Sequence, residues 1–129
     1  MEKLLNGLVA LLAVALMGFG LYSVVAVDAL GPMTGLRPDG ALGISEMRAI
    51  YGSFLIQGLL MIWALARPRV RAPVLMVLGL TWAGYIAMRL LSIALDGFDP
   101  AMTAALASEA VVAVVLIAAA CTPRPSIQS

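Results

Sequence analysis

The chain has 129 residues, of which 63% are hydrophobic and only 12% are charged. Soluble domains carry about 25% charged residues, so this composition excludes a water-soluble globule. The net charge of +1 excludes a strongly charged surface for nucleic acid. Because the sequence has one cysteine, Cys121, and no histidine, it excludes an internal disulfide and a Cys/His metal site. We expect no cofactor.

The length suits one membrane domain. A spanning helix needs about 20 apolar residues, so the chain accommodates four spans with short connections and no separate soluble domain. We therefore expect an all-α integral membrane protein, with residues 1–129 forming a single antiparallel bundle of four transmembrane helices. The expected helices cover about residues 4–28, 45–66, 73–95 and 101–121.

The first apolar run extends from Leu4 to Val27 and meets no charge before Asp28. A cleaved signal peptide is the alternative interpretation, but its apolar core is only about 7–15 residues long. The run is longer than that, so we expect a retained helix. Gly18 and Gly20 are expected to let another helix approach closely.

The connections are predicted from turn-forming residues. Leu30 to Gly43 is rich in glycine and proline and should form the longest loop. Ser45 should cap the second helix, with Glu46 near the positive end of its dipole. That helix should end before a basic turn, Arg67 to Arg71, and Pro73 should mark the start of the third helix.

Loop charges predict the topology. Most basic residues outside the expected spans fall on one side of the membrane: Lys3, the turn of Arg67 to Arg71, and Arg124. Arg37 is the one basic residue expected on the other side. Four aspartates also gather on that other side: Asp28, Asp39, Asp96 and Asp99. By the positive-inside rule, both termini are expected to be cytoplasmic and the acidic loops to face outward. The tail from Cys121 is expected to be short and mobile.

Polar side chains of different helices are expected at similar depth. Counting 1.5 Å per residue from the outer helix ends, Arg48 and Tyr51 lie roughly 5–9 Å inside the boundary, Arg89 about 9 Å and Glu109 about 12 Å. Tyr22 on the first helix should lie at a similar depth. These residues should therefore occupy one layer in the outer leaflet.

The third helix has the clearest polar face. Its polar residues recur at spacings of three and four: Thr81, Tyr85, Arg89, Ser92 and Asp96. A polar face toward lipid is costly, so we expect it to point toward other helices. Glu109 shares a row with the small residues Ala101, Ala105 and Ala113, and it should also face inward.

Charges inside the membrane need partners. A lone charge at mid-bilayer costs roughly 2.5–3.5 kcal/mol, so we expect Arg89 to pair with Glu109, and Arg48 to pair with Glu46 or Asp96. On a helix, however, Glu46 points nearly opposite to Arg48. Either Glu46 reaches solvent at the helix mouth, or the second helix contacts partners on both sides.

Two interpretations of this polar layer remain open. One is a hydrated, charge-balanced pocket that opens outward, and the other is a structural network of ion pairs or snorkelling side chains. The candidate ligand-binding residues are Glu46, Arg48, Tyr51, Tyr85, Arg89, Ser92, Asp96 and Glu109. Both tyrosines could be acid groups, although aromatic packing is favoured. No catalytic residue is predicted.

A family resemblance rests on three short stretches. In chain order, the stretches that carry the resemblance are Glu46-Met47-Arg48-Ala49-Ile50-Tyr51-Gly52, Arg67-Pro68-Arg69, and Arg89-Leu90-Leu91-Ser92 with Asp96-Gly97. The chain resembles a family of small four-helix bacterial membrane proteins known as domain of unknown function 4345, which is similar in architecture to the DoxX-like proteins. Ser53 departs from this pattern, where a second glycine is expected. The resemblance implies a four-helix bundle in the bacterial inner membrane and no established activity.

The function expected from these observations is binding of a small amphipathic or lipid-like molecule whose acidic or polar head meets Arg48 and Arg89. The alternative is an accessory or chaperone subunit that packs against a larger membrane protein or another copy of itself. An enzyme is third, because it would depend on Glu109, Glu46 or Tyr51 as acid/base groups. The expected partners are the lipid bilayer and such a ligand or protein, and not nucleic acid.

Overall fold

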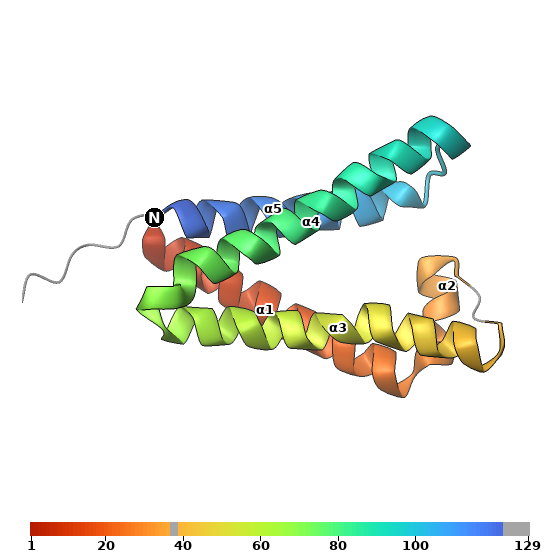
Figure 1. Cartoon of the computed structure of the whole chain (residues 1–129), viewed down its shortest axis with the longest axis horizontal. Helices are drawn as coiled ribbons and strands as arrows, with labels where there is room; N and C mark the ends of the chain where they lie inside the picture. The colour runs from red at the N-terminus through yellow and green to blue at the C-terminus, as the bar shows by residue number, and fades with distance from the viewer. Residues whose placement is uncertain (37–38, 123–129) are drawn as a thin grey trace, which may run out of the picture. The chain divides into compact units, whose positions relative to one another are not determined.

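The computed structural model describes residues 1–36 and 39–122, and all regular elements in these residues are helices. Four of them are long: α1 (Glu2–Val25), α3 (Gly40–Ala66), α4 (Pro68–Asp96) and α5 (Met102–Cys121). Two short elements separate α1 from α3 (Figure 1): the 3₁₀ turn η1 (Val27–Ala29) and α2 (Leu30–Thr34). The four long helices are long and apolar enough to cross a membrane. The prediction of an all-α protein with four helices able to span a membrane is confirmed.

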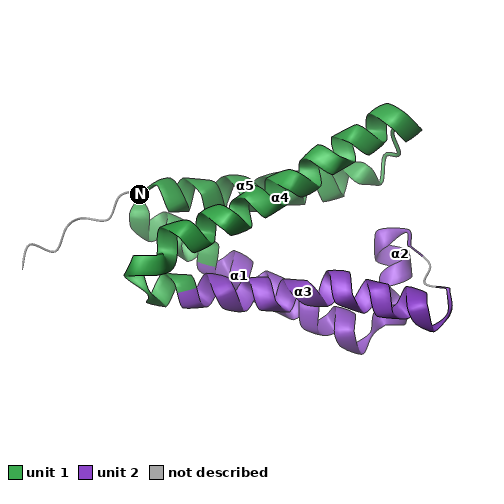
Figure 2. Cartoon of the chain, viewed as in Figure 1, with its two compact units in different colours: residues 1–9, 64–129 green, residues 10–63 purple. Residues whose placement is uncertain are grey.

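The chain divides into two compact units (Figure 2). The first unit combines residues 1–9 with residues 64–129, so it holds the start of α1 together with α4 and α5. The second unit holds residues 10–63, which include most of α1, the two short elements and most of α3.

In the second unit, glycines allow α1 and α3 to pack closely. A Cβ added to Gly58 would lie 2.6 Å from the carbonyl oxygen of Ala13, and one added to Gly20 would overlap the backbone of Leu55. These contacts advance along α1 as they retreat along α3, so the two helices are antiparallel. The predicted close approach is confirmed at Gly20, whereas Gly18 has nothing within 4 Å of an added Cβ.

The segment predicted as the longest loop is mostly helical. Val27 and Leu30 are buried against Met47 of α3, and this burial of apolar side chains favours a compact segment over an extended loop. α2 ends at Gly35, which has a φ of 73°, a conformation that glycine adopts without strain. The next long helix begins at Gly40, so Ser45 lies inside it and is not a cap. Two of the residues used to predict the topology, Arg37 and Arg124, lie outside the described residues. The tail beyond Thr122 lies outside them as well.

In the first unit, α4 and α5 lie side by side (Figure 1). Gly79 of α4 faces α5, because a Cβ there would lie 2.7 Å from Cγ1 of Ile117. Gly97, with a φ of 98°, follows α4. Buried residues of α4 recur at helical spacing, as expected for a face covered by other helices: Arg71, Leu75, Leu78, Gly79 and Trp82.

The start of α4 differs from the prediction. Arg67 is extended and precedes the helix, and Pro68 occupies its first turn, where the missing proline N–H has no helical partner to lose. Pro73 therefore lies inside the helix, where it removes one backbone hydrogen bond. As a result Arg71, predicted in the basic turn, is part of α4 and contributes to its buried face.

Candidate functional site

An ion pair joins α4 to α5 in the first unit. Nε of Arg89 donates to Oε1 of Glu109 at 2.8 Å and to Oε2 at 2.9 Å. Glu109 is 6% exposed as a residue, whereas 41% of the Arg89 side chain remains exposed. The predicted pairing of Arg89 with Glu109 is confirmed.

The packing of α5 explains why Glu109 is buried. Val112, Ala113 and Leu116 follow Glu109 on the same side of α5 and are also buried. Ala113 is small enough to bring α4 near, as its place in the predicted alanine row suggested. The prediction that Glu109 faces inward is confirmed, and a charge-assisted hydrogen bond satisfies its carboxylate there.

The ion pair uses only part of the hydrogen-bonding capacity of Arg89. A guanidinium has five N–H donors, and the bond to Glu109 uses the single N–H on Nε. Within the described part of the chain, the terminal nitrogens Nη1 and Nη2 have no protein acceptor. Arg89 is therefore compensated in charge, but four N–H groups on a half-exposed side chain remain open to water or a ligand.

The rest of the polar face of α4 does not all point toward other helices as predicted. Thr81, Tyr85 and Asp96 are exposed, and Ser92 is half-buried. The large apolar side chains that are buried on α4 lie on the same side of the helix but nearer its start: Leu75, Leu78 and Trp82. Within the described residues, Arg89 is the member of this polar face that forms an ion pair with α5.

Polar groups on this face are bonded within α4. Thr81 donates its hydroxyl to the carbonyl of Val77 at 3.0 Å, and Ser92 donates to Oδ2 of Asp96 at 3.1 Å. The second bond leaves the Asp96 carboxylate with further acceptor capacity at the end of the helix.

Both candidate tyrosines take part in aromatic packing. Tyr85 lies edge-on to Trp82, with ring centroids 5.5 Å apart and planes at 83°. Tyr51 makes similar contacts with Phe19, at 5.8 Å and 89°, and with Phe54, at 6.0 Å and 83°. Edge-to-face contacts of this kind stabilise a fold. The packing interpretation of both tyrosines is confirmed.

Arg48 lies in the second unit and bonds to backbone. Its Nε donates to the carbonyl oxygen of Val24 at 3.3 Å. Val24 belongs to the last turn of α1, where carbonyls lack helical donors and a positive charge is favoured. Arg48 therefore caps α1 within its own unit.

The predicted ion pair of Arg48 with Glu46 is wrong. Glu46 is exposed in the second turn of α3, and residues two positions apart on a helix do not face each other. The other suggested partner of Arg48, Asp96, belongs to the first unit, where it accepts a bond from Ser92.

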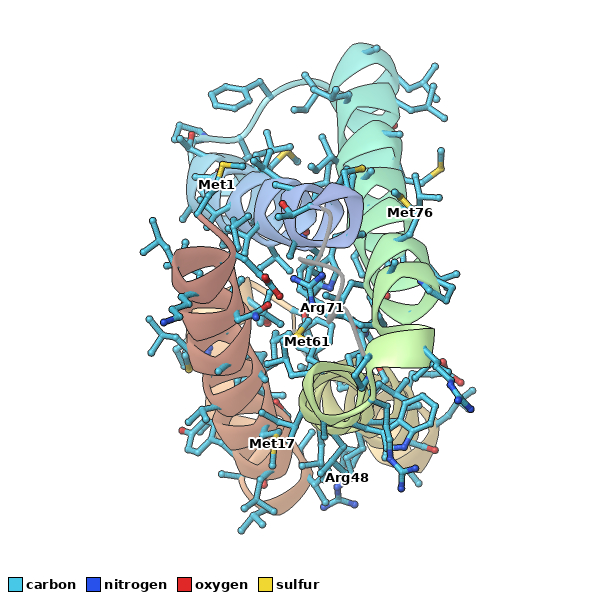
Figure 3. The ribbon with its side chains drawn as sticks, turned by 90° about the vertical axis from the view of Figure 1, so that its left-hand side faces the viewer. Met1, Met17, Arg48, Met61, Arg71 and Met76 are labelled. Carbon is cyan, nitrogen blue, oxygen red and sulfur yellow. The ribbon has the colours of Figure 1, made fainter. Side chains whose placement is uncertain are left out.

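A buried arginine was missed from the sequence. Arg71 is 3% exposed and donates from Nη2 and Nε to Oδ1 of Asn6, at 2.7 Å and 3.2 Å. Its side chain lies between α4 and the start of α1, within the first unit (Figure 3). The spacing between Arg71 and Arg89 in the sequence could have identified it. Eighteen residues equal five helical turns, so both arginines lie on one face of a continuous helix.

These features define a class of protein: a multi-pass membrane protein of four apolar helices, two of which are joined by an ion pair. The sequence matches the family called domain of unknown function DUF4345 over residues 4–120, and the chain belongs to that family. No curated protein and no solved structure matches the chain. The described residues include no group of three or more acidic, cysteine or histidine side chains that could hold a metal ion.

Proposed function

We propose that the protein binds a small amphipathic, lipid-like molecule at the Arg89–Glu109 pair. The observation that supports this function most directly is the geometry of Arg89. Its charge is balanced by the buried carboxylate of Glu109 through Nε alone, while 41% of the side chain is exposed. The terminal nitrogens can therefore bind the polar head of a ligand.

In a membrane, N–H groups without an acceptor carry a free-energy cost. Polar groups without partners are costly in hydrocarbon, so the terminal N–H groups of Arg89 need water or a polar head. The neighbouring side chains of Met88 and Leu90 are exposed and can contact acyl chains. A polar centre flanked by apolar surface suits an amphipathic molecule better than a soluble metabolite.

The charge distribution supports a location in the outer leaflet of the bacterial inner membrane. Lys3, Arg67 and Arg69 are exposed in the first unit and lie at or just before the starts of α1 and α4. The positive-inside rule places such residues in the cytoplasm. Arg89 lies toward the opposite end of α4, so the proposed site belongs to the outward half of the membrane.

The test compares lipid retention in two variants. Replacing both members of the pair, Arg89→Met with Glu109→Leu, removes the polar site without leaving an unpaired charge. We expect the variant to keep the helical content of the wild-type protein but to lose lipids that remain bound during purification, as measured by native mass spectrometry. Arg69→Met is the matched control, since Arg69 is exposed near the other end of α4.

Two results would contradict the proposal. Equal lipid retention by the double variant and the wild-type protein would make the ion pair structural only. Equal loss in the Arg69→Met control would indicate a general effect of positive charge on lipid binding.

The alternative function is that of an accessory subunit in which the ion pair is structural. Ala104, Ala107 and Val111 are exposed on α5, and small side chains suit lateral contact with another membrane helix. Replacing Ala107 with Trp should then release a co-purifying partner in mild detergent. If no protein co-purifies with the wild-type chain, this alternative loses its support.

A further inference from the structure

The polar face of α4 continues beyond Arg89 to a carboxylate. Ser92 and Asp96 follow at spacings of three and four residues, so they share a face with Arg89. Ser92 donates to Oδ2 of Asp96, and Asp96 is exposed. No cationic side chain pairs with Asp96 in the part of the chain that the structure describes.

The charges on this face do not balance. Glu109 compensates Arg89 at 2.8 Å, so the negative charge of Asp96 remains. Asp99 follows in the connection to α5, where its Oδ1 accepts a bond from the N–H of Ala101 at 2.8 Å. The region around Arg89 is therefore net negative, which opposes a purely anionic head and favours one that also carries a cation.

The available groups also distinguish between types of cation. A quaternary ammonium is best recognised by a cage of aromatic rings, but Trp82 and Tyr85 precede Arg89 on the side away from Asp96, and near Asp96 in sequence the exposed Phe98 offers a single ring. Asp96 and Ser92 instead offer oxygen acceptors. A primary ammonium, which donates three hydrogen bonds, is the matching group.

We propose that the bound head is zwitterionic, with a phosphate on the terminal nitrogens of Arg89 and a primary ammonium on the Asp96 carboxylate. This inference rests on the proposed function and specifies its ligand class as a phospholipid of the phosphoethanolamine type. Asp96 lies seven residues beyond Arg89, about 10 Å along the helix axis. Helical side chains tilt toward the N-terminus, so the Asp96 carboxylate leans toward Arg89, and the bound head spans the remaining distance.

The experiment uses the full chain in nanodiscs of equimolar phosphatidylethanolamine, phosphatidylglycerol and phosphatidylcholine, with lipids retained on the protein identified by native mass spectrometry. We expect phosphatidylethanolamine to be enriched by up to about fivefold, the range of an exposed charge pair. Asp96→Asn should abolish the enrichment and keep total lipid retention. Asp28→Asn, which changes an exposed aspartate of the second unit, should leave both unchanged.

The outcomes separate this inference from the proposed function. Enrichment of phosphatidylglycerol or phosphatidylcholine, or a preference unchanged in Asp96→Asn, would overturn the zwitterionic head. The proposed function would still stand if Arg89→Met with Glu109→Leu lowered total retention. Unchanged retention in that double variant would refute the site itself, whatever lipid is enriched.

Discussion

Arg71 and Arg89 lie on one face of α4, eighteen residues and five helical turns apart. Their separation along the axis is about 27 Å, close to the roughly 30 Å of the hydrocarbon core. In the first unit each arginine meets a polar side chain from another helix, Asn6 in α1 and Glu109 in α5. Directional bonds thus fix both ends of α4, and an apolar face occupies the length between them.

The first prediction concerns the coupling between Arg89 and Glu109. Glu109→Leu should lower the free energy of unfolding by about 1–3 kcal/mol, because it leaves the charge of Arg89 without its partner. Adding Arg89→Met should recover part of this loss, since the unpaired charge is then removed. Unfolding titrations in mixed detergent micelles measure both effects. Strictly additive effects of the two substitutions would contradict the coupling.

The second prediction compares two glycines of α1. Gly20→Ala should destabilise the protein by about 1–3 kcal/mol, because the added Cβ overlaps the backbone of Leu55 and forces the helices apart. Gly18→Ala should be neutral or stabilising by up to about 1 kcal/mol, since nothing lies within 4 Å of its added Cβ. Thermal unfolding followed by circular dichroism distinguishes them. Equal effects would refute close packing at Gly20.

The third prediction concerns the buried arginine at the start of α4. Arg71→Met should lower the free energy of unfolding by about 1.5–3 kcal/mol, because charged hydrogen bonds to Asn6 are lost. Arg69→Met should change it by less than about 0.5 kcal/mol, since Arg69 is exposed. The same unfolding titration measures both variants. A neutral effect of Arg71→Met would mean that the contact with Asn6 contributes nothing to stability.

The fourth prediction tests the topology. Cys121, the only cysteine of the chain, is exposed at the end of α5. A membrane-impermeant maleimide should label it only after the cells are permeabilised, because the positive-inside rule places this end in the cytoplasm. Asp99→Cys in a Cys121→Ser background should be labelled in intact spheroplasts. The reverse pattern would invert the topology and move the proposed site to the inner leaflet.

The sequence by itself determined the four spans and the pairing of Arg89 with Glu109. Long apolar runs identify spanning helices because backbone polar groups must be satisfied inside the membrane. The cost of an unpaired charge then made Glu109 the natural partner for an arginine predicted at nearly the same depth. The identification of the spans uses the local sequence pattern alone, and the pairing uses in addition the depth of each residue counted along its helix.

Only the tertiary structure decided which polar side chains are buried and what they bond. Arg71 is buried because the start of α1 meets it, and Arg48 bonds to a carbonyl because the end of α1 lies near it. Leu30 packs with Val27 on Met47, and the start of the expected loop is the short helix α2 instead. These outcomes depend on contacts between residues distant in the chain, and no local periodicity encodes such contacts.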